Sequence, residues 1–75
     1  MLSKGEVLKR FGKNIKDARA EINLSQDELA EKAKIHRTYM GRIERGESNP
    51  PFWTIYKIAT ALKKKTTDLI DLSSQ

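Results

Sequence analysis

The 75-residue chain contains no cysteine, so it can form neither a disulfide nor a zinc site built on thiolates. This absence fits a reducing cytoplasm, where we expect the protein to be located. No run of apolar residues is longer than two, which excludes a membrane-spanning helix and the core of a signal peptide. We therefore expect one small domain over residues 1–75, with its folded core at about residues 6–72 and no association with a membrane.

Residues that catalyse reactions or hold ligands are also scarce. His36 is the single histidine, and the chain has no glycine-rich loop that could hold a phosphate. No second ligand or nucleophile accompanies His36, so it is better suited to capping a helix or contacting a phosphate than to catalysis or metal binding. We expect no enzyme activity, no metal, no cofactor and no small-molecule ligand.

Charge is abundant and unevenly distributed. Fifteen Lys and Arg against ten Asp and Glu give a formal net charge of +5. Five basic residues stand against one acidic residue from Lys4 to Lys16, one against five from Asp17 to Glu31, and four against one from Lys34 to Arg45. Such segregation is typical of a surface that binds a polyanion such as double-stranded DNA. On charge alone, an ordinary solvated surface remains the alternative.

Residues 25–46 predict two short helices joined by a sharp turn. Ser25, followed three residues later by Glu28, forms a capping box that starts a helix at Gln26. Residues 34–36 are too few for anything except a turn, and a second helix follows over about residues 37–45. Gly46 ends this helix, because glycine tolerates a left-handed backbone.

The second of these helices has two different faces. At 100° per residue, one arc of about 140° holds Arg37, Thr38, Gly41, Arg42 and Arg45, whereas Met40, Ile43 and Glu44 lie outside it. One face is therefore basic and the other is built for burial. A helix of this kind fits the major groove of DNA, where Arg37 and Arg42 can each donate two hydrogen bonds to guanine and Thr38 can add a hydroxyl or methyl contact.

The rest of the chain predicts three further helices. Apolar residues at positions 7, 11, 15, 18 and 22 indicate a helix over about residues 6–21, preceded by a mobile arm over residues 1–5 and followed by a left-handed turn at Asn23. Ile55, Ile58, Ala59 and Leu62 form the buried stripe of a helix that begins at Pro51 or Phe52. A last short helix covers residue 66 or 67 to about residue 72, and residues 73–75 form a tail.

Three segments together carry a family resemblance: LSQDELA at residues 24–30, IERG at 43–46 and KIATAL at 57–62. They resemble the helix-turn-helix family of phage Cro and repressor DNA-binding domains over about residues 11–72. The short chain and the run from His36 to Arg45 most resemble the controller proteins of bacterial restriction-modification systems. The resemblance implies an all-α fold, a compact five-helix bundle of the lambda-repressor type. The lysines at 63–65 depart from the family pattern, which usually has a glycine and an aliphatic residue there, so the turn geometry and one core contact stay open.

The resemblance also implies roles for individual residues. Arg37, Thr38 and Arg42 correspond to positions that contact bases, while Arg19 and Glu44 correspond to a salt bridge between helices. Gln26 corresponds to a position that contacts the DNA backbone. From their places on or beside the second helix, we expect further backbone contacts from His36, Tyr39, Arg45, Ser48 and Asn49. For Tyr39, half-buried packing is the alternative.

These features predict a sequence-specific transcriptional regulator that binds a palindromic operator as a homodimer. We expect the two-fold interface to use Leu69, Ile70 or Leu72 with part of the segment 52–56. RNA polymerase is a candidate second partner, and the sequence leaves open whether the protein represses or activates. The alternative is a protein-interaction module with the same fold, such as an antitoxin subunit, which the basic face of the second helix argues against.

Overall fold

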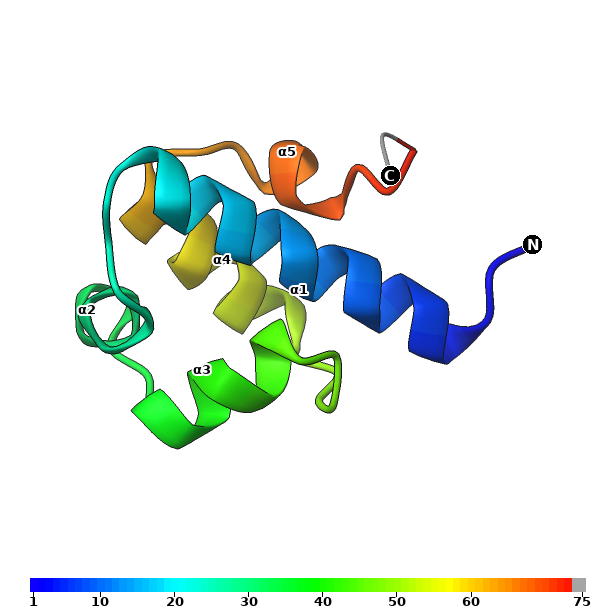
Figure 1. Cartoon of the computed structure of the whole chain (residues 1–75), viewed down its shortest axis with the longest axis horizontal. Helices are drawn as coiled ribbons and strands as arrows, with labels where there is room; N and C mark the ends of the chain where they lie inside the picture. Colours follow the sequence, from blue (N-terminus) through cyan, green and yellow to red (C-terminus); the bar gives the residue numbers. More distant parts are fainter. Residues whose placement is uncertain (74–75) are drawn as a thin grey trace.

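The computed structural model describes residues 1–73, in which helices are the only regular secondary structure. The helices are α1 (Lys4–Glu21), α2 (Gln26–Ala33), α3 (Arg37–Glu44), α4 (Phe52–Leu62) and α5 (Thr66–Ile70). In Figure 1 the long α1 lies across α4 and α3, and α5 lies on its other side. The predicted all-α, five-helix fold is confirmed. Of the expected tail, residues 74 and 75 lie outside the described residues.

The first helix begins two residues earlier than the sequence predicted. Ser3 caps α1, because its Oγ accepts a hydrogen bond from the Glu6 amide at 3.2 Å and its own amide donates to Glu6 Oε1 at 2.9 Å. This is the same capping box that starts α2, where Ser25 and Glu28 exchange bonds of 2.8 and 3.0 Å. The expected arm over residues 1–5 is therefore wrong from Ser3 onwards.

Left-handed residues end the helices and turn the chain. Asn23 (φ 55°) and Gly46 (φ 75°) adopt the predicted conformation. Lys34 (φ 59°) and Lys63 (φ 58°) adopt it as well, at the C-caps of α2 and α4. The turn after α4 thus keeps the left-handed geometry that glycine would favour, and a lysine bears the steric cost.

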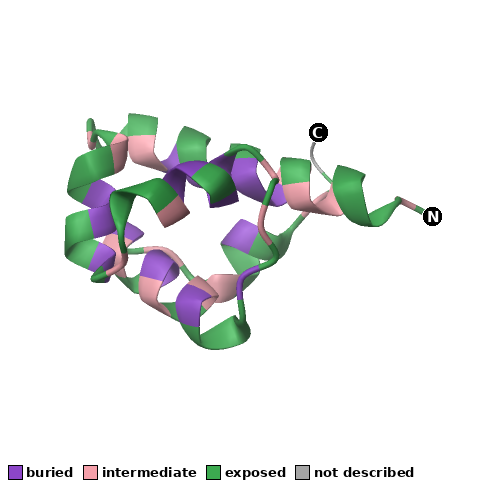
Figure 2. Ribbon diagram, turned by 90° about the horizontal axis from the view of Figure 1, so that it is seen from below, coloured by how far each residue is buried: buried purple, intermediate pink, exposed green. Residues whose placement is uncertain are grey.

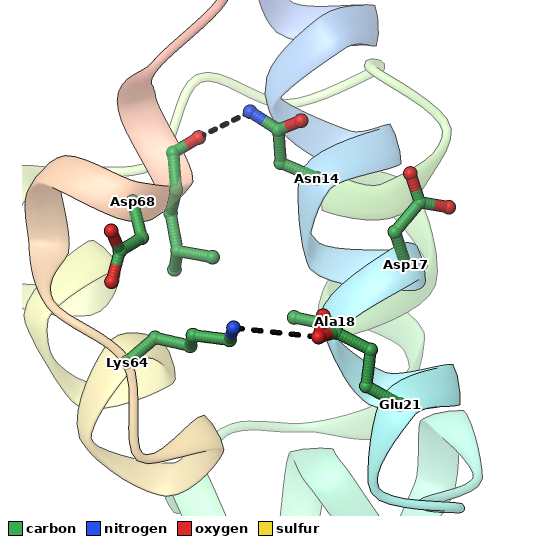
Figure 3. Close-up of a pocket in the computed structure, with 7 residues that line it drawn as sticks. Asn14, Asp17, Ala18, Glu21, Lys64 and Asp68 are labelled. Atoms are coloured by element: carbon green, nitrogen blue, oxygen red, sulfur yellow. Dashed lines mark hydrogen bonds and ion pairs between the residues drawn. The ribbon is translucent and has the colours of Figure 1, made fainter. Parts of the chain in front are cut away.

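The last helix ends at Ile70 rather than near Leu72. Asn14 on α1 donates from Nδ2 to the carbonyls of Leu69 (2.8 Å) and Asp71 (2.9 Å), the first of which is drawn in Figure 3. Arg10 on α1 donates to the Leu72 carbonyl at 2.9 Å. Side chains of α1 therefore satisfy these carbonyls in an extended segment, and further helix formation is not needed to satisfy them.

Each helix contributes one inward face to a single core. In Figure 2 each helix carries both buried (purple) and exposed (green) stretches of ribbon. The buried apolar residues are Phe11, Ile15, Ala18, Leu29, Ala30, Ala33, Met40, Ile43, Ile58, Ala59, Leu62 and Leu69. The predicted stripe of α1 is confirmed for its buried members, but Ile22 caps the helix and is exposed.

Gly12 allows α1 and α3 to touch backbone to backbone. A Cβ on Gly12 would lie 2.7 Å from the Ile43 carbonyl oxygen and 2.8 Å from the Glu44 carbonyl carbon, and it would also collide with the Glu44 oxygen. The sequence suggests only an interruption of the helix at this position. In the structure, the missing side chain sets how closely α3 approaches α1.

Candidate nucleic-acid interface

The two faces of α3 are separated as the helical spacing predicts. Met40 and Ile43 are fully buried and Glu44 is buried with them, whereas Arg37, Thr38 and Arg42 are exposed. His36 caps the helix, because its Nδ1 accepts a hydrogen bond from the Thr38 amide at 3.0 Å. Tyr39 is half-buried and packs against the core, which is the alternative that the sequence left open for this residue.

The buried face of α3 is held by a charged network that joins three helices. Arg19 on α1 donates from Nε and Nη2 to the two carboxylate oxygens of Glu44, each at 2.8 Å, and from Nη1 to the Leu24 carbonyl at 2.9 Å. The Arg19 side chain is 16% exposed and the Glu44 side chain 1%. The hydrogen bonds to Glu44 raise the pKa of Arg19 above its ordinary value. This two-bonded pair therefore fixes the angle between α1 and α3.

Gln26 completes this network. Its Nε2 donates to Glu44 Oε1 at 3.2 Å, and its side chain is half-buried against α3. The sequence interpretation places Gln26 only against the DNA backbone. Its link to Glu44 depends on how α2 packs against α3, which no local sequence pattern reveals.

A shallow groove runs between the start of α2 and the exposed face of α3. It is lined by Gln26, Asp27, Arg37, Thr38, Gly41 and Arg45. Arg37 Nη1 lies 3.7 Å from Asp27 Oδ2, a loose ion pair between two exposed side chains. The groove therefore brings together Gln26, Arg37, Thr38 and Arg45 of the predicted site residues.

The remaining predicted site residues flank this groove. Arg42 lies on the exposed face, where it has no side-chain hydrogen bond or ion pair among residues 1–73. Ser48 and Asn49 follow α3 in the loop before α4, the first half-buried and the second exposed. His36 stands at the opposite end of α3, so the predicted contacts extend along the whole helix.

Glu47 is a residue of this surface that the sequence analysis missed. Its carboxylate accepts from Arg45 Nε at 3.1 Å and from Arg45 Nη2 at 3.2 Å. The hydrogen bonds from Arg45, with a smaller contribution from the charge of Arg42, lower the pKa of Glu47. Acidic residues two positions from an arginine do not share a helical face, so only the turn at Gly46 brings this pair together.

Five large apolar side chains of the described residues beyond position 20 are exposed. Phe52, Trp53 and Tyr56 belong to α4, Ile70 to α5, and Ile22 to the first turn. The rings of Trp53 and Tyr56 stack with their centroids 5.7 Å apart. Leu69 is 1% exposed inside the core and Leu72 is half-buried against it. The inclusion of Leu69 in a dimer interface is therefore wrong, because its side chain is not at the surface.

The described residues offer neither a metal site nor a membrane span. Among residues 1–73, no group of three or more His, Cys, Asp or Glu side chains is placed to hold a metal ion. None of the helices over those residues combines the length and the hydropathy that crossing a membrane requires.

Comparison with known proteins assigns the family. The HTH_3 family model, described as helix-turn-helix, matches residues 15–69. The control protein C.BamHI of Bacillus amyloliquefaciens is 38% identical over 65 residues, covering 85% of this chain and 80% of the relative. The control protein C.SmaI of Serratia marcescens is 35% identical, covering 87% and 77%. The crystal structure of the restriction-modification controller protein C.AhdI from Aeromonas hydrophila superimposes with a TM-score of 0.81 and 37% identity, covering 83% of this chain and 94% of that one. These proteins are regulators and not enzymes, and this chain belongs with them to the helix-turn-helix family of DNA-binding transcriptional regulators.

Proposed function

We propose that the protein is a sequence-specific regulator that binds a palindromic operator as a homodimer in the cytoplasm, as the controller of a restriction-modification system. The observation that carries this proposal is the exposed face of α3, where Arg37, Thr38 and Arg42 stand clear of the core. The similarity to two control proteins and to C.AhdI supports the controller role. None of these three side chains belongs to the core, so the exposed face of α3 is available to a ligand.

The residues of this surface divide into readers and anchors. Arg37, Thr38 and Arg42 reach base edges in the major groove, where an arginine can donate two hydrogen bonds to guanine O6 and N7. The contacts to the DNA backbone come from Gln26 at the start of α2, from His36 at the start of α3, from the outer edge of half-buried Tyr39, and from Ser48 and Asn49 in the loop after α3. Such contacts position a protein on DNA but carry little sequence information.

Selection from a library of randomised duplexes tests this division. We expect the wild-type protein to enrich a palindrome whose half-sites lie about 34 Å apart, one turn of DNA. Arg37→Ala and Arg42→Ala should each weaken binding to the selected duplex by about 1–3 kcal/mol and hardly change binding to random DNA. Asn49→Ala is the matched anchor variant, and it should weaken all duplexes alike. Equal losses on both kinds of DNA for the two arginine variants would show that they do not read bases.

The homodimer uses the exposed apolar side chains of α4 and α5 in this proposal. The proposed patch consists of Phe52, Trp53 and Tyr56 on α4 and Ile70 on α5, which are large, apolar and exposed. Leu72 follows Ile70 by two residues. A two-fold axis through this region places the patch of one chain against the same patch of its partner. The same patch is the observation that favours the alternative, a module that binds a different protein.

Sedimentation of the purified chain separates these two possibilities. We expect a dimer at tens of micromolar and a monomer for Trp53→Asp or Ile70→Asp. Ile22→Asp removes a similarly exposed isoleucine from the turn after α1 and should leave the dimer intact. A wild-type chain that stays monomeric even on the selected duplex would contradict the homodimer.

A further inference from the structure

Arg45 and Glu47 form an ion pair whose geometry differs from that of the other exposed pairs. The carboxylate takes one edge of the guanidinium, since Nε donates to Oε2 at 3.1 Å and Nη2 donates to Oε1 at 3.2 Å. The opposite edge, with both protons of Nη1 and the second proton of Nη2, points away from Glu47. That remaining edge has the planar, two-donor geometry that matches guanine O6 and N7.

The end of α3 fixes the position of the carboxylate. The Glu47 amide donates to the Arg42 carbonyl at 2.9 Å and the Gly46 amide donates to the Ile43 carbonyl at 3.1 Å, with Gly46 at φ 75°. These two bonds form a Schellman motif, which ties the two residues after the helix to its last turn. Glu47 is therefore placed by the helix itself rather than by the loop that follows.

Gly41 provides the space in which the arginine lies. Arg45 Nη1 is only 3.0 Å from the point that a Cβ on Gly41 would occupy. The guanidinium is therefore folded back over the middle of the exposed face of α3, where it lines the same groove as Arg37 and Thr38.

We propose that Arg45 reads a guanine in the operator and that Glu47 is the positioning residue that holds it for this task. The sequence places Arg45 among the backbone contacts, but the pair with Glu47 argues against that role, because a carboxylate beside a phosphate is repelled. A guanidinium held in place before binding also loses less side-chain entropy when it meets a base. This inference rests on the proposed sequence-specific function and adds a fourth reader to it.

The experiment compares DNA selected by four proteins: the wild type, Arg45→Ala, Glu47→Gln and Glu47→Ala. We expect the wild-type site to contain one guanine in each half-site that Arg45→Ala no longer selects. On the wild-type duplex, Arg45→Ala should bind about five- to 150-fold more weakly, with little change on random DNA. Glu47→Ala should lose preference at the same base pair and bind random DNA about two- to fivefold more tightly. Glu47→Gln keeps one accepting oxygen and should retain more of the base preference than Glu47→Ala.

Glu21→Gln provides the matched control. Glu21, at the end of α1, is an exposed carboxylate that pairs with Lys64, in the turn after α4, at 3.5 Å (Figure 3). Neither residue belongs to α3 or lines the groove beside it. The substitution makes the same change of net charge as Glu47→Gln. It should change neither the selected sequence nor the preference for any base.

The outcomes separate this inference from the proposed function. If the wild type enriches no sequence, the sequence-specific function fails and the inference fails with it. If a site is enriched but Arg45→Ala selects the same site and weakens all duplexes alike, with the salt dependence reduced by about one phosphate contact, Arg45 is an anchor and the inference alone is wrong. If Arg45→Ala loses the guanine while both Glu47 variants behave as wild type, Glu47 has no positioning role.

Discussion

Removing either partner of the Arg19 and Glu44 pair should destabilise the protein, and removing Arg19 should cost more. Arg19→Ala leaves a carboxylate whose side chain is 1% exposed and whose remaining hydrogen bond comes from Gln26 at 3.2 Å. Glu44→Ala leaves a guanidinium that is 16% exposed and keeps its bond to the Leu24 carbonyl. Breaking a buried pair costs about 3–5 kcal/mol, so we expect Glu44→Ala near the lower end of this range and Arg19→Ala near the upper end.

These losses are large for a domain of this size. At about 0.05–0.15 kcal/mol per residue, a chain of 75 residues has a free energy of unfolding of roughly 4–11 kcal/mol. For a small domain each kcal/mol shifts the melting temperature by about 4–8 °C. Glu44→Ala should therefore melt at least ten degrees below the wild type, and Arg19→Ala lower still.

A double-mutant cycle with thermal and urea unfolding checks the coupling. The double variant should be less destabilised than the two single losses added together, by about 1–3 kcal/mol, because the second substitution removes a charge that the first has left unpaired. DNA affinity measured well below the melting temperature should change little, since Glu44 faces the core. Additive effects with unchanged melting, together with tighter DNA binding by Glu44→Ala, would instead make Glu44 a surface charge that opposes DNA.

Three further changes test other parts of the fold. Gly12→Ala should lower the free energy of unfolding by about 2 kcal/mol in a urea titration, in spite of the better helix propensity of alanine, because its Cβ meets the backbone of α3. Gly5→Ala should be neutral or stabilising in the same titration, since its Cβ would make only an ordinary contact with Ser3 Oγ at 4.0 Å. Lys63→Gly should raise the melting temperature by several degrees, because glycine adopts φ 58° without the steric cost of about 1 kcal/mol, and a lower value would contradict this reasoning. The hydrogen bonds from Ser3 and Ser25 lower the pKa of Glu6 and Glu28 below 4.5. The stability that these two carboxylates contribute is therefore present above that pH and is lost as the pH falls through their folded-state pKa. Replacing both glutamates by glutamine should make acid unfolding less steep, and an unchanged pH profile would show that these carboxylates do not cause the acid unfolding.

Local patterns were sufficient to predict much of the helix-turn-helix. Residues close together in sequence determine the capping box at Ser25, the left-handed turn at Gly46 and the two faces of α3. The sequence alone is therefore enough to predict these three features. Ser3 and Glu6 form an equally local pattern, so the start of α1 at Lys4 is also encoded by residues close together in sequence.

Contacts between distant segments could not be predicted in the same way. Gly12 looks like a weak point in a helix until the carbonyls of α3 are placed against it. Leu69 and Ile70 are adjacent aliphatic residues in a helix too short to show a clear period, and only packing against α1 distinguishes the buried one from the exposed one. The turn at Gly46 likewise joins Arg45 to Glu47 across a spacing that no helical rule connects.

The separation between the two faces of α3 makes the proposed operator preference open to redesign. Positions 37, 38 and 42 support no core contact, while the core takes Met40 and Ile43 from the same helix. In a combinatorial library over those three exposed positions, selection for DNA binding would therefore remove many variants, whereas misfolding would remove few. New operators could be reached through single substitutions without compensating changes inside the protein, so a family built on this frame can diversify its targets faster than its interior.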